Sequence, residues 1–229
     1  MSLFVNTKDI VAPGEALADG MDYLPGAFTY RQGKKILAKR LGLVNVEGRA
    51  IKLIPLSGRY LPKVGDTIIV EVFDITMSGW LVRTNSAYHA MLSTKDISRF
   101  VRRDEDLTNY FDIGDCLRVK IVKVTSQNLV DVSMKEPGLT KLSGGKIIKV
   151  NPHKVPRIIG KQGSMVSLIK DKTNCLISVG QNGVVWIKGK PDEELLAINA
   201  VKKIEAEAHL EGLTEKMTQF LSNGGKNGI

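Results

Sequence analysis

The chain has 229 residues, 43% hydrophobic and 25% charged, and its 33 Lys and Arg against 24 Asp and Glu give a formal net charge of +9. These values are ordinary for a globular protein and exclude disorder along the whole chain, and no apolar run is long enough for a membrane-spanning helix. Two widely separated cysteines exclude a disulfide scaffold and a thiolate zinc site, and with no signal-peptide pattern at the start we expect a reducing, cytoplasmic location.

Residues 1–62 alternate short apolar runs with turn residues. Pro-Gly pairs and single glycines separate apolar runs at 27–30, 35–38 and 50–54. This pattern predicts a small β-rich domain of short strands joined by tight turns. Because such a short segment buries little core of its own, we expect it to dock on a partner. The candidates for apolar contact there, or for filling the small core, are Phe4, Tyr23, Leu24 and Phe28.

Residues 63–138 have the pattern of a small barrel. A Val-Gly-Asp sequence at 64–66 precedes the first strand, and Ile-Gly-Asp at 113–115 precedes the fourth. Five strands are predicted, with one longer polar connection after the third, over residues 67–75, 79–83, 88–92, 116–124 and 129–134. This arrangement is typical of an OB-fold barrel.

In residues 139–221 the pattern predicts both strands and helices. Residues 222–229 contain too few apolar side chains to pack against the domain, so we expect them to form a flexible tail. Strands are predicted at 146–150, 175–179 and 184–187, with an Asn-Gly hairpin at 182–183, and helices at 164–172, from Pro191 onward and at 214–221. We expect the long helix from Pro191 to bury a face made of Leu195, Ile198, Val201, Ile204 and Ala208.

The positive charge gathers in the last of these segments. Residues 1–62 carry +4, residues 63–138 carry −1 and residues 139–229 carry +6. Residues 141–172 hold eight basic residues and only one acid, Asp171. Such a cluster is typical of a protein that binds a polyanion, although a solvated surface explains it equally well.

A glycine motif inside the basic cluster favours the polyanion. Ile158-Ile159 precede Gly160-Lys161-Gln162-Gly163, and Ser164 follows. Glycines allow a sharp turn and leave no Cβ between the backbone and a sugar-phosphate chain. The N–H groups that begin the next helix can then face phosphates. A lone Gly-x-x-Gly also occurs in purely structural turns, but here it lies in β–α–GxxG–α–β–β–α order.

That order resembles a type I KH domain, whose loop clamps about four nucleotides of single-stranded RNA or DNA. The resemblance implies RNA contacts at the loop and on the preceding segment, namely Lys154, Arg157, Gly160, Lys161, Gln162, Gly163 and Ser164.

The barrel segment resembles the S-one type of OB-fold, named for a ribosomal protein. Where that family carries stacking aromatics and a histidine, this chain has Ser78, Leu81 and Ser93, while Trp80, Tyr88 and His89 are offset. We therefore expect contact through basic side chains rather than base stacking, the alternative being a solvated barrel surface. The candidates are Arg83, Lys95, Arg99, Arg102, Arg103, Lys120 and Lys123.

The order of the three segments resembles that of one protein family over almost the whole chain. The first junction carries the sequence Tyr60-x-Pro62-x-x-Gly65-Asp66. It is the KH-containing RNA-binding cap subunit of the archaeal exosome, the ribosomal-RNA-processing protein four family. The resemblance implies a non-catalytic subunit of a 3′-to-5′ RNA degradation complex. Three copies would surround the pore entrance of a hexameric ring of phosphorolytic ribonuclease subunits and feed single-stranded RNA inward, with residues 1–62 as the anchor.

The residues predict no enzyme, cofactor or metal. His89, His153 and His209 lie in different contexts without metal-ligand spacing, and the acidic run at 104–106 has no second group of carboxylates to share a metal with. The alternative function is a free-standing RNA-binding regulator or translation factor with the same domains.

Overall fold

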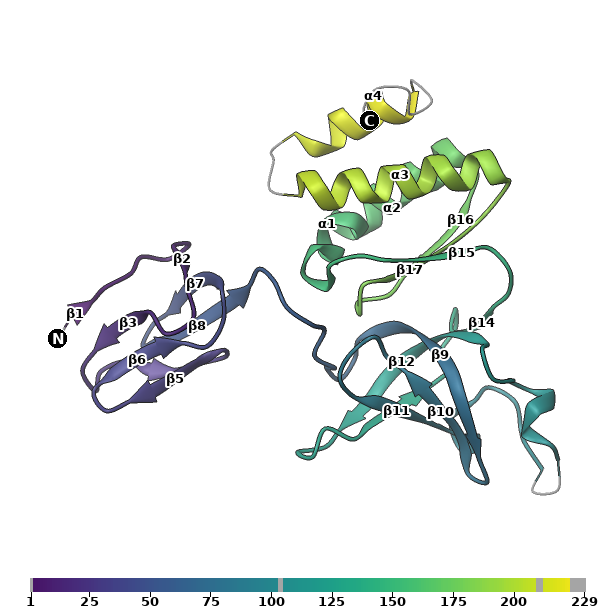
Figure 1. Cartoon of the computed structure of the whole chain (residues 1–229), viewed down its shortest axis with the longest axis horizontal. Helices are drawn as coiled ribbons and strands as arrows, with labels where there is room; N and C mark the ends of the chain where they lie inside the picture. Colours follow the sequence, from purple (N-terminus) through teal and green to yellow (C-terminus); the bar gives the residue numbers. More distant parts are fainter. Residues whose placement is uncertain (1, 103–104, 209–211, 223–229) are drawn as a thin grey trace. The chain divides into compact units, whose positions relative to one another are not determined.

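The structure, a computed structural model, describes residues 2–102, 105–208 and 212–222 (Figure 1). The chain forms two compact units, Met1–Gly58 and Arg59–Ile229. Within the described residues, no helix is both long and apolar enough to cross a membrane.

The first unit packs two four-stranded sheets around a small core. One sheet has the order β1 (Ser2–Leu3), β3 (Ala16–Asp19), β6 (Lys35–Ala38) and β5 (Thr29–Gln32). The other has the order β2 (Ile10–Val11), β7 (Gly42–Glu47), β8 (Ala50–Pro55) and β4 (Leu24–Pro25). Alternate residues point inward, and Leu17, Ile36 and Ile51 are fully buried between the sheets. The predicted β-rich N-terminal domain is confirmed.

The second unit begins with a closed barrel. Its five main strands are β9 (Thr67–Thr76), β10 (Gly79–Arg83), β11 (His89–Ser93), β12 (Cys116–Val124) and β13 (Val130–Ser133). The order β13-β11-β10-β9-β12 closes on itself because β13 also pairs with β12, and β14 (Lys141–Leu142) adds to the free edge of β12. Two 3₁₀ turns, η1 (Thr94–Asp96) and η2 (Leu107–Asn109), lie in the long connection after β11. This is the predicted OB-fold.

The residues after the barrel form a three-stranded sheet covered by helices (Figure 1). The sheet has the antiparallel order β15 (Lys146–Lys149), β17 (Val184–Lys188) and β16 (Leu176–Val179). The helical segments in chain order are η3 (Pro152–Lys154), α1 (Val155–Ile159), η4 (Lys161–Gly163), α2 (Ser164–Thr173), α3 (Pro191–Glu207) and α4 (Leu213–Ser222). One apolar core joins the sheet to all four α-helices. The β–α–α–β–β–α order is that of the predicted type I KH domain.

One predicted core position on α3 is wrong. Leu195 is 51% exposed, whereas Glu194 beside it is buried. The Glu194 carboxylate accepts a hydrogen bond from the Gly189 N–H at 3.1 Å and lies 3.9 Å from the Lys146 ammonium. Because these partners compensate the buried charge, the buried face of the helix runs through Glu194, Ala197, Val201 and Ile204.

The barrel and the KH domain contact each other through the turn between β16 and β17. The backbone N–H of Gln181 donates to the Thr67 carbonyl at 2.9 Å, and its side-chain oxygen accepts from the Thr67 N–H at 2.7 Å. Ile69 of the barrel also joins a small apolar cluster with Val184 and Trp186. The two domains therefore share both polar and apolar contacts within one compact unit.

Candidate nucleic-acid interface

The Gly160–Gly163 loop joins α1 to α2 through a backbone that most residues adopt only at a cost. Gly160 has φ 76° and ψ 174°, Gln162 has φ 54°, and Gly163 has φ 83°. A Cβ on Gly160 would lie 2.6 Å from the Met165 backbone nitrogen and 2.9 Å from Ser164 Oγ. The first glycine is therefore required both by its dihedral angles and by the close approach of α2.

The start of α2 has no side-chain cap, although the Ser164 N–H donates to the Lys161 carbonyl of the loop. Gly163 occupies the N-cap position, and no side chain caps the helix there. The first N–H groups of a helix lack intrahelical acceptors and carry the positive end of the helix dipole. Lys161, Gln162 and Ser164 are exposed around them. The loop thus places the positive end of the helix dipole beside one cation and two polar side chains, a combination that suits a phosphate.

Of the two predicted contacts before the loop, one is exposed and one is engaged within the fold. Arg157 on α1 is exposed. The Lys154 ammonium instead donates to the Glu205 carbonyl at 2.8 Å, near the C-terminal end of α3. A cation at this end of a helix is favourable, so Lys154 ties α1 to α3.

The cations predicted on the barrel have different surroundings. Lys120 is engaged, because its ammonium donates to both carboxylate oxygens of Glu136 at 2.6 and 2.8 Å. Lys123 is exposed near the end of β12, and Lys95 is exposed in η1. Arg102 is exposed in the connection after β11, and Arg103 lies outside the described residues. Arg83 and Arg99 each line a cavity.

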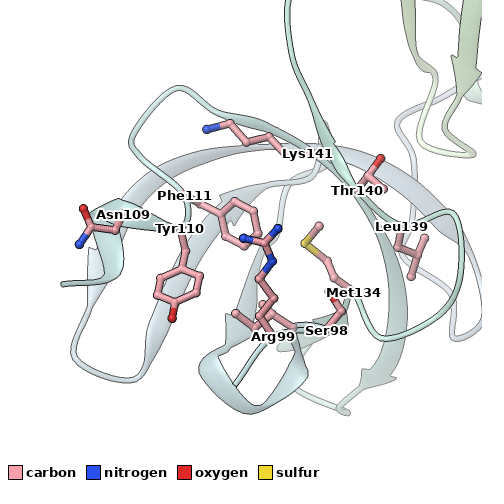
Figure 2. A pocket seen from close by; sticks show the side chains of 10 residues that line it. Ser98, Arg99, Asn109, Tyr110, Phe111, Met134, Leu139, Thr140 and Lys141 are labelled. Carbon is pink, nitrogen blue, oxygen red and sulfur yellow. The ribbon is translucent and has the colours of Figure 1, made fainter. Parts of the chain in front are cut away.

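Arg99 extends into a pocket of about 280 Å³ beside the barrel, and Figure 2 shows it among aromatic and apolar side chains. Tyr110 and Phe111 line one side, and Met134 and Leu139 lie opposite. The Tyr110 hydroxyl donates to the Glu105 carboxylate, which raises the pKa of Tyr110 and lowers that of Glu105. The two aromatics beside Arg99 were not singled out from the sequence, because their segment has no strand or helix periodicity.

The aromatic residues of the barrel strands fall into two groups. Trp80 is fully buried in the barrel core, and its indole N–H donates to the Phe111 carbonyl at 2.9 Å. It is therefore a core residue. His89 is exposed and packs against Phe73, with ring centroids 4.6 Å apart. Phe73 was missed in the sequence, although alternation along residues 67–76 places it on the outer face with Glu71.

The described residues contain no group of three or more His, Cys, Asp or Glu side chains placed to hold a metal ion. His209 and Asp104 lie outside the described residues. The Cys116 thiol has a raised pKa because of its burial and the carboxylates of Glu71 and Asp115. A raised pKa keeps a thiol protonated and lowers its nucleophilicity.

Comparison with known proteins finds a family model that matches the N-terminal domain and another that matches the KH domain. A family model for the KH domain matches residues 145–203, and one for the exosome RNA binding protein RRP4 N-terminal domain matches residues 8–57. The chain is 44% identical to exosome complex component Rrp4 of Methanobrevibacter smithii over 96% of this chain and 73% of that protein. It is 41% identical to the protein of the same name from Methanothermus fervidus, over 96% of this chain and 97% of that one.

A solved structure agrees with these matches. The crystal structure of a protein provisionally described as an exosome complex RNA-binding protein has a TM-score of 0.65 and 31% identity. It covers 73% of this chain and 97% of that one. Sequence, domain models and fold point the same way, and the chain belongs to the family of the exosome complex component Rrp4.

Proposed function

We propose that this chain is a non-catalytic RNA-binding subunit of a cytoplasmic exosome that degrades RNA in the 3′-to-5′ direction. Three copies form a cap on a hexameric ring of phosphorolytic ribonuclease subunits. They hold single-stranded RNA at the pore entrance and feed it to the ring. Three weak sites around one pore raise the effective concentration of RNA there without new contacts.

The observation that carries the proposal is the backbone of the Gly160–Gly163 loop. Its left-handed residues place Lys161 and Gln162, both exposed, at the N-terminus of α2, which has no side-chain cap. Contact with three to four phosphates there predicts a slope of about −2 to −3 for log K against log salt concentration, at about −0.7 per phosphate.

Changing both central loop residues tests the site. In the double variant Lys161→Asp and Gln162→Asp, both glycines and the buried side chains of α1 and α2 are unchanged. Two carboxylates beside the phosphate path should weaken binding to single-stranded RNA and flatten the salt dependence. A matched control is Lys202→Asp, an exposed lysine on α3. Wild-type affinity and slope in a folded double variant would place the RNA elsewhere on the chain.

The non-catalytic part of the proposal is supported by the relatives, which are named as exosome complex components, and by the match to the KH domain. We expect purified chain incubated with labelled RNA, phosphate and Mg²⁺ to release no nucleotides. Turnover that co-elutes with the protein and is lost in Asp106→Asn would contradict this expectation.

A further inference from the structure

A groove of about 260 Å³ lies where the barrel meets the KH domain, inside the unit Arg59–Ile229. Strands β9, β10 and β11 contribute side chains from the barrel, and β15 and β17 contribute side chains from the KH domain. Among them are Arg83, His89 and Lys149. None of these three residues belongs to the glycine loop, so the groove is a separate place where cationic side chains lie beside an aromatic ring.

Phe73 holds two of the groove side chains in place. The His89 imidazole packs on the Phe73 ring with centroids 4.6 Å apart and an angle of 46° between the planes. The Arg83 guanidinium lies over the same ring, 5.3 Å from its centroid. Aromatic and cation–π contacts of this kind restrict side-chain motion. Three adjacent strands thus present a preformed surface, on which the His89 ring is exposed.

The charges in the groove suit a single phosphate. Arg83 comes from the barrel wall and Lys149 from the KH wall, and both are exposed. Glu71 is the acid of the groove, and its carboxylate lies 4.0 Å from Arg83. Two cations against one carboxylate leave one positive charge for the ligand. Ile147, 43% exposed on the KH side, adds an apolar surface.

Stacking ring, apolar wall and excess positive charge are the features with which proteins bind unpaired nucleotides. The walls are fixed relative to each other, because the buried Asn182 of the KH domain hydrogen-bonds to Ile69 and Thr84 of the barrel. Positions Leu81 and Ser93, where stacking residues are absent, lie on β10 and β11 outside the lining of the groove, whereas Arg83 and His89 belong to it.

We propose that this groove binds one nucleotide of single-stranded RNA, an inference that rests on the proposed function. The base lies against His89 and Ile147, and its phosphate lies between Arg83 and Lys149. Phe73 is a positioning residue that holds Arg83 and His89. The chain then grips RNA at two places, the glycine loop and the groove.

The test compares a short and a long RNA on the intact chain. A tetranucleotide is about long enough to fill the glycine loop alone, whereas an oligonucleotide of about 15 residues can also reach the groove. For the long RNA we expect His89→Ala to weaken binding about tenfold. Lys149→Gln should reduce the salt slope by about 0.7. Both variants should bind the tetranucleotide as the wild type does, and the control Lys202→Gln should change neither RNA.

Photo-crosslinking gives a readout that does not depend on affinity. Long RNA containing 5-iodouridine should crosslink to the tryptic peptide 84–95, which contains His89. The crosslink should decrease in His89→Ala and persist in the loop variant Lys161→Asp/Gln162→Asp at saturating RNA.

Three results would contradict the proposal that the groove binds RNA. They are unchanged long-RNA binding in both folded variants, an equal loss for short and long RNA, or no crosslink in peptide 84–95. In each case the proposed function stands as long as the loop variant still loses RNA. If the loop variant also binds like the wild type, the proposed function fails as well, so the two failures are distinguishable.

Discussion

Asn182 shows how much a single residue does at the boundary between the barrel and the KH domain. Its side chain is fully buried, accepts a hydrogen bond from the Ile69 N–H at 3.3 Å, and donates to the Ile69 and Thr84 carbonyls at 2.7 and 2.8 Å. Its own carbonyl accepts from the Asn85 amide at 2.9 Å. Asn182 was predicted from the sequence only as a turn residue, because its partners lie about a hundred positions away.

We expect Asn182→Ala to destabilise this unit by about 3 kcal/mol. The change leaves buried backbone groups of Ile69 and Thr84 without partners, and each such group costs about 1–3 kcal/mol. The measurement is urea denaturation followed by tryptophan fluorescence, since Trp80 reports the barrel core and Trp186 reports the KH domain.

The matched control is Asn109→Ala, at an exposed asparagine in η2. It should change stability by less than about 0.5 kcal/mol. A midpoint for Asn182→Ala equal to that of the control would mean that the hairpin contributes little to the junction.

At the scale of elements, the sequence predicted the strands of the barrel well and missed some strands of the first unit. The prediction for residues 67–75 differs from β9 by one residue, and that for residues 116–124 coincides with β12. The strands β3 and β7 were not singled out. Strands in a unit with little core depend on pairing with neighbouring strands, which local periodicity does not record.

The two candidate RNA sites also differ in how well the sequence alone could predict them. The glycine loop is contiguous in sequence, and its dihedral angles demand glycine, so its residues could be recognised as a motif. The groove joins Phe73, Arg83, His89 and Lys149 from four strands. The pairing of β9, β10 and β11 brings the first three together, and the contact between the barrel and the KH domain adds Lys149. The buried Glu194 escaped prediction for a related reason, because its partners Gly189 and Lys146 lie outside its helix.

At the scale of the whole molecule, the predicted docking role of the first unit directs attention to its exposed apolar side chains. Of the four apolar candidates, Phe4 and Leu24 are 53% and 59% exposed, whereas Tyr23 and Phe28 pack against the core. Ile10 is also exposed. Because a contiguous patch of exposed apolar side chains marks an interaction surface, these three are the candidates for the docking contact. The unit's net charge of +4 would add an attraction to an acidic partner that weakens with salt.

The structure locates where this unit can be removed. Tyr60 is buried in the barrel core, and its hydroxyl donates to the Asp66 carboxylate at 2.6 Å. Burial and this carboxylate raise the pKa of Tyr60. A deletion must therefore end at Gly58, the last residue of the first unit, and keep Tyr60 with the barrel.

We expect the chain without residues 1–58 to keep its affinity for single-stranded RNA, because the glycine loop and the groove both lie beyond the cut. It should fail to co-elute with a ring of phosphorolytic subunits or to speed the decay of long RNA by that ring. In the full chain, Phe4→Asp with Leu24→Asp should weaken ring binding without changing RNA binding, since charges would replace two exposed apolar contacts. The control Lys34→Asp alters an exposed turn residue of the same unit. Undiminished ring binding by the deletion would place the anchor in the barrel or the KH domain instead.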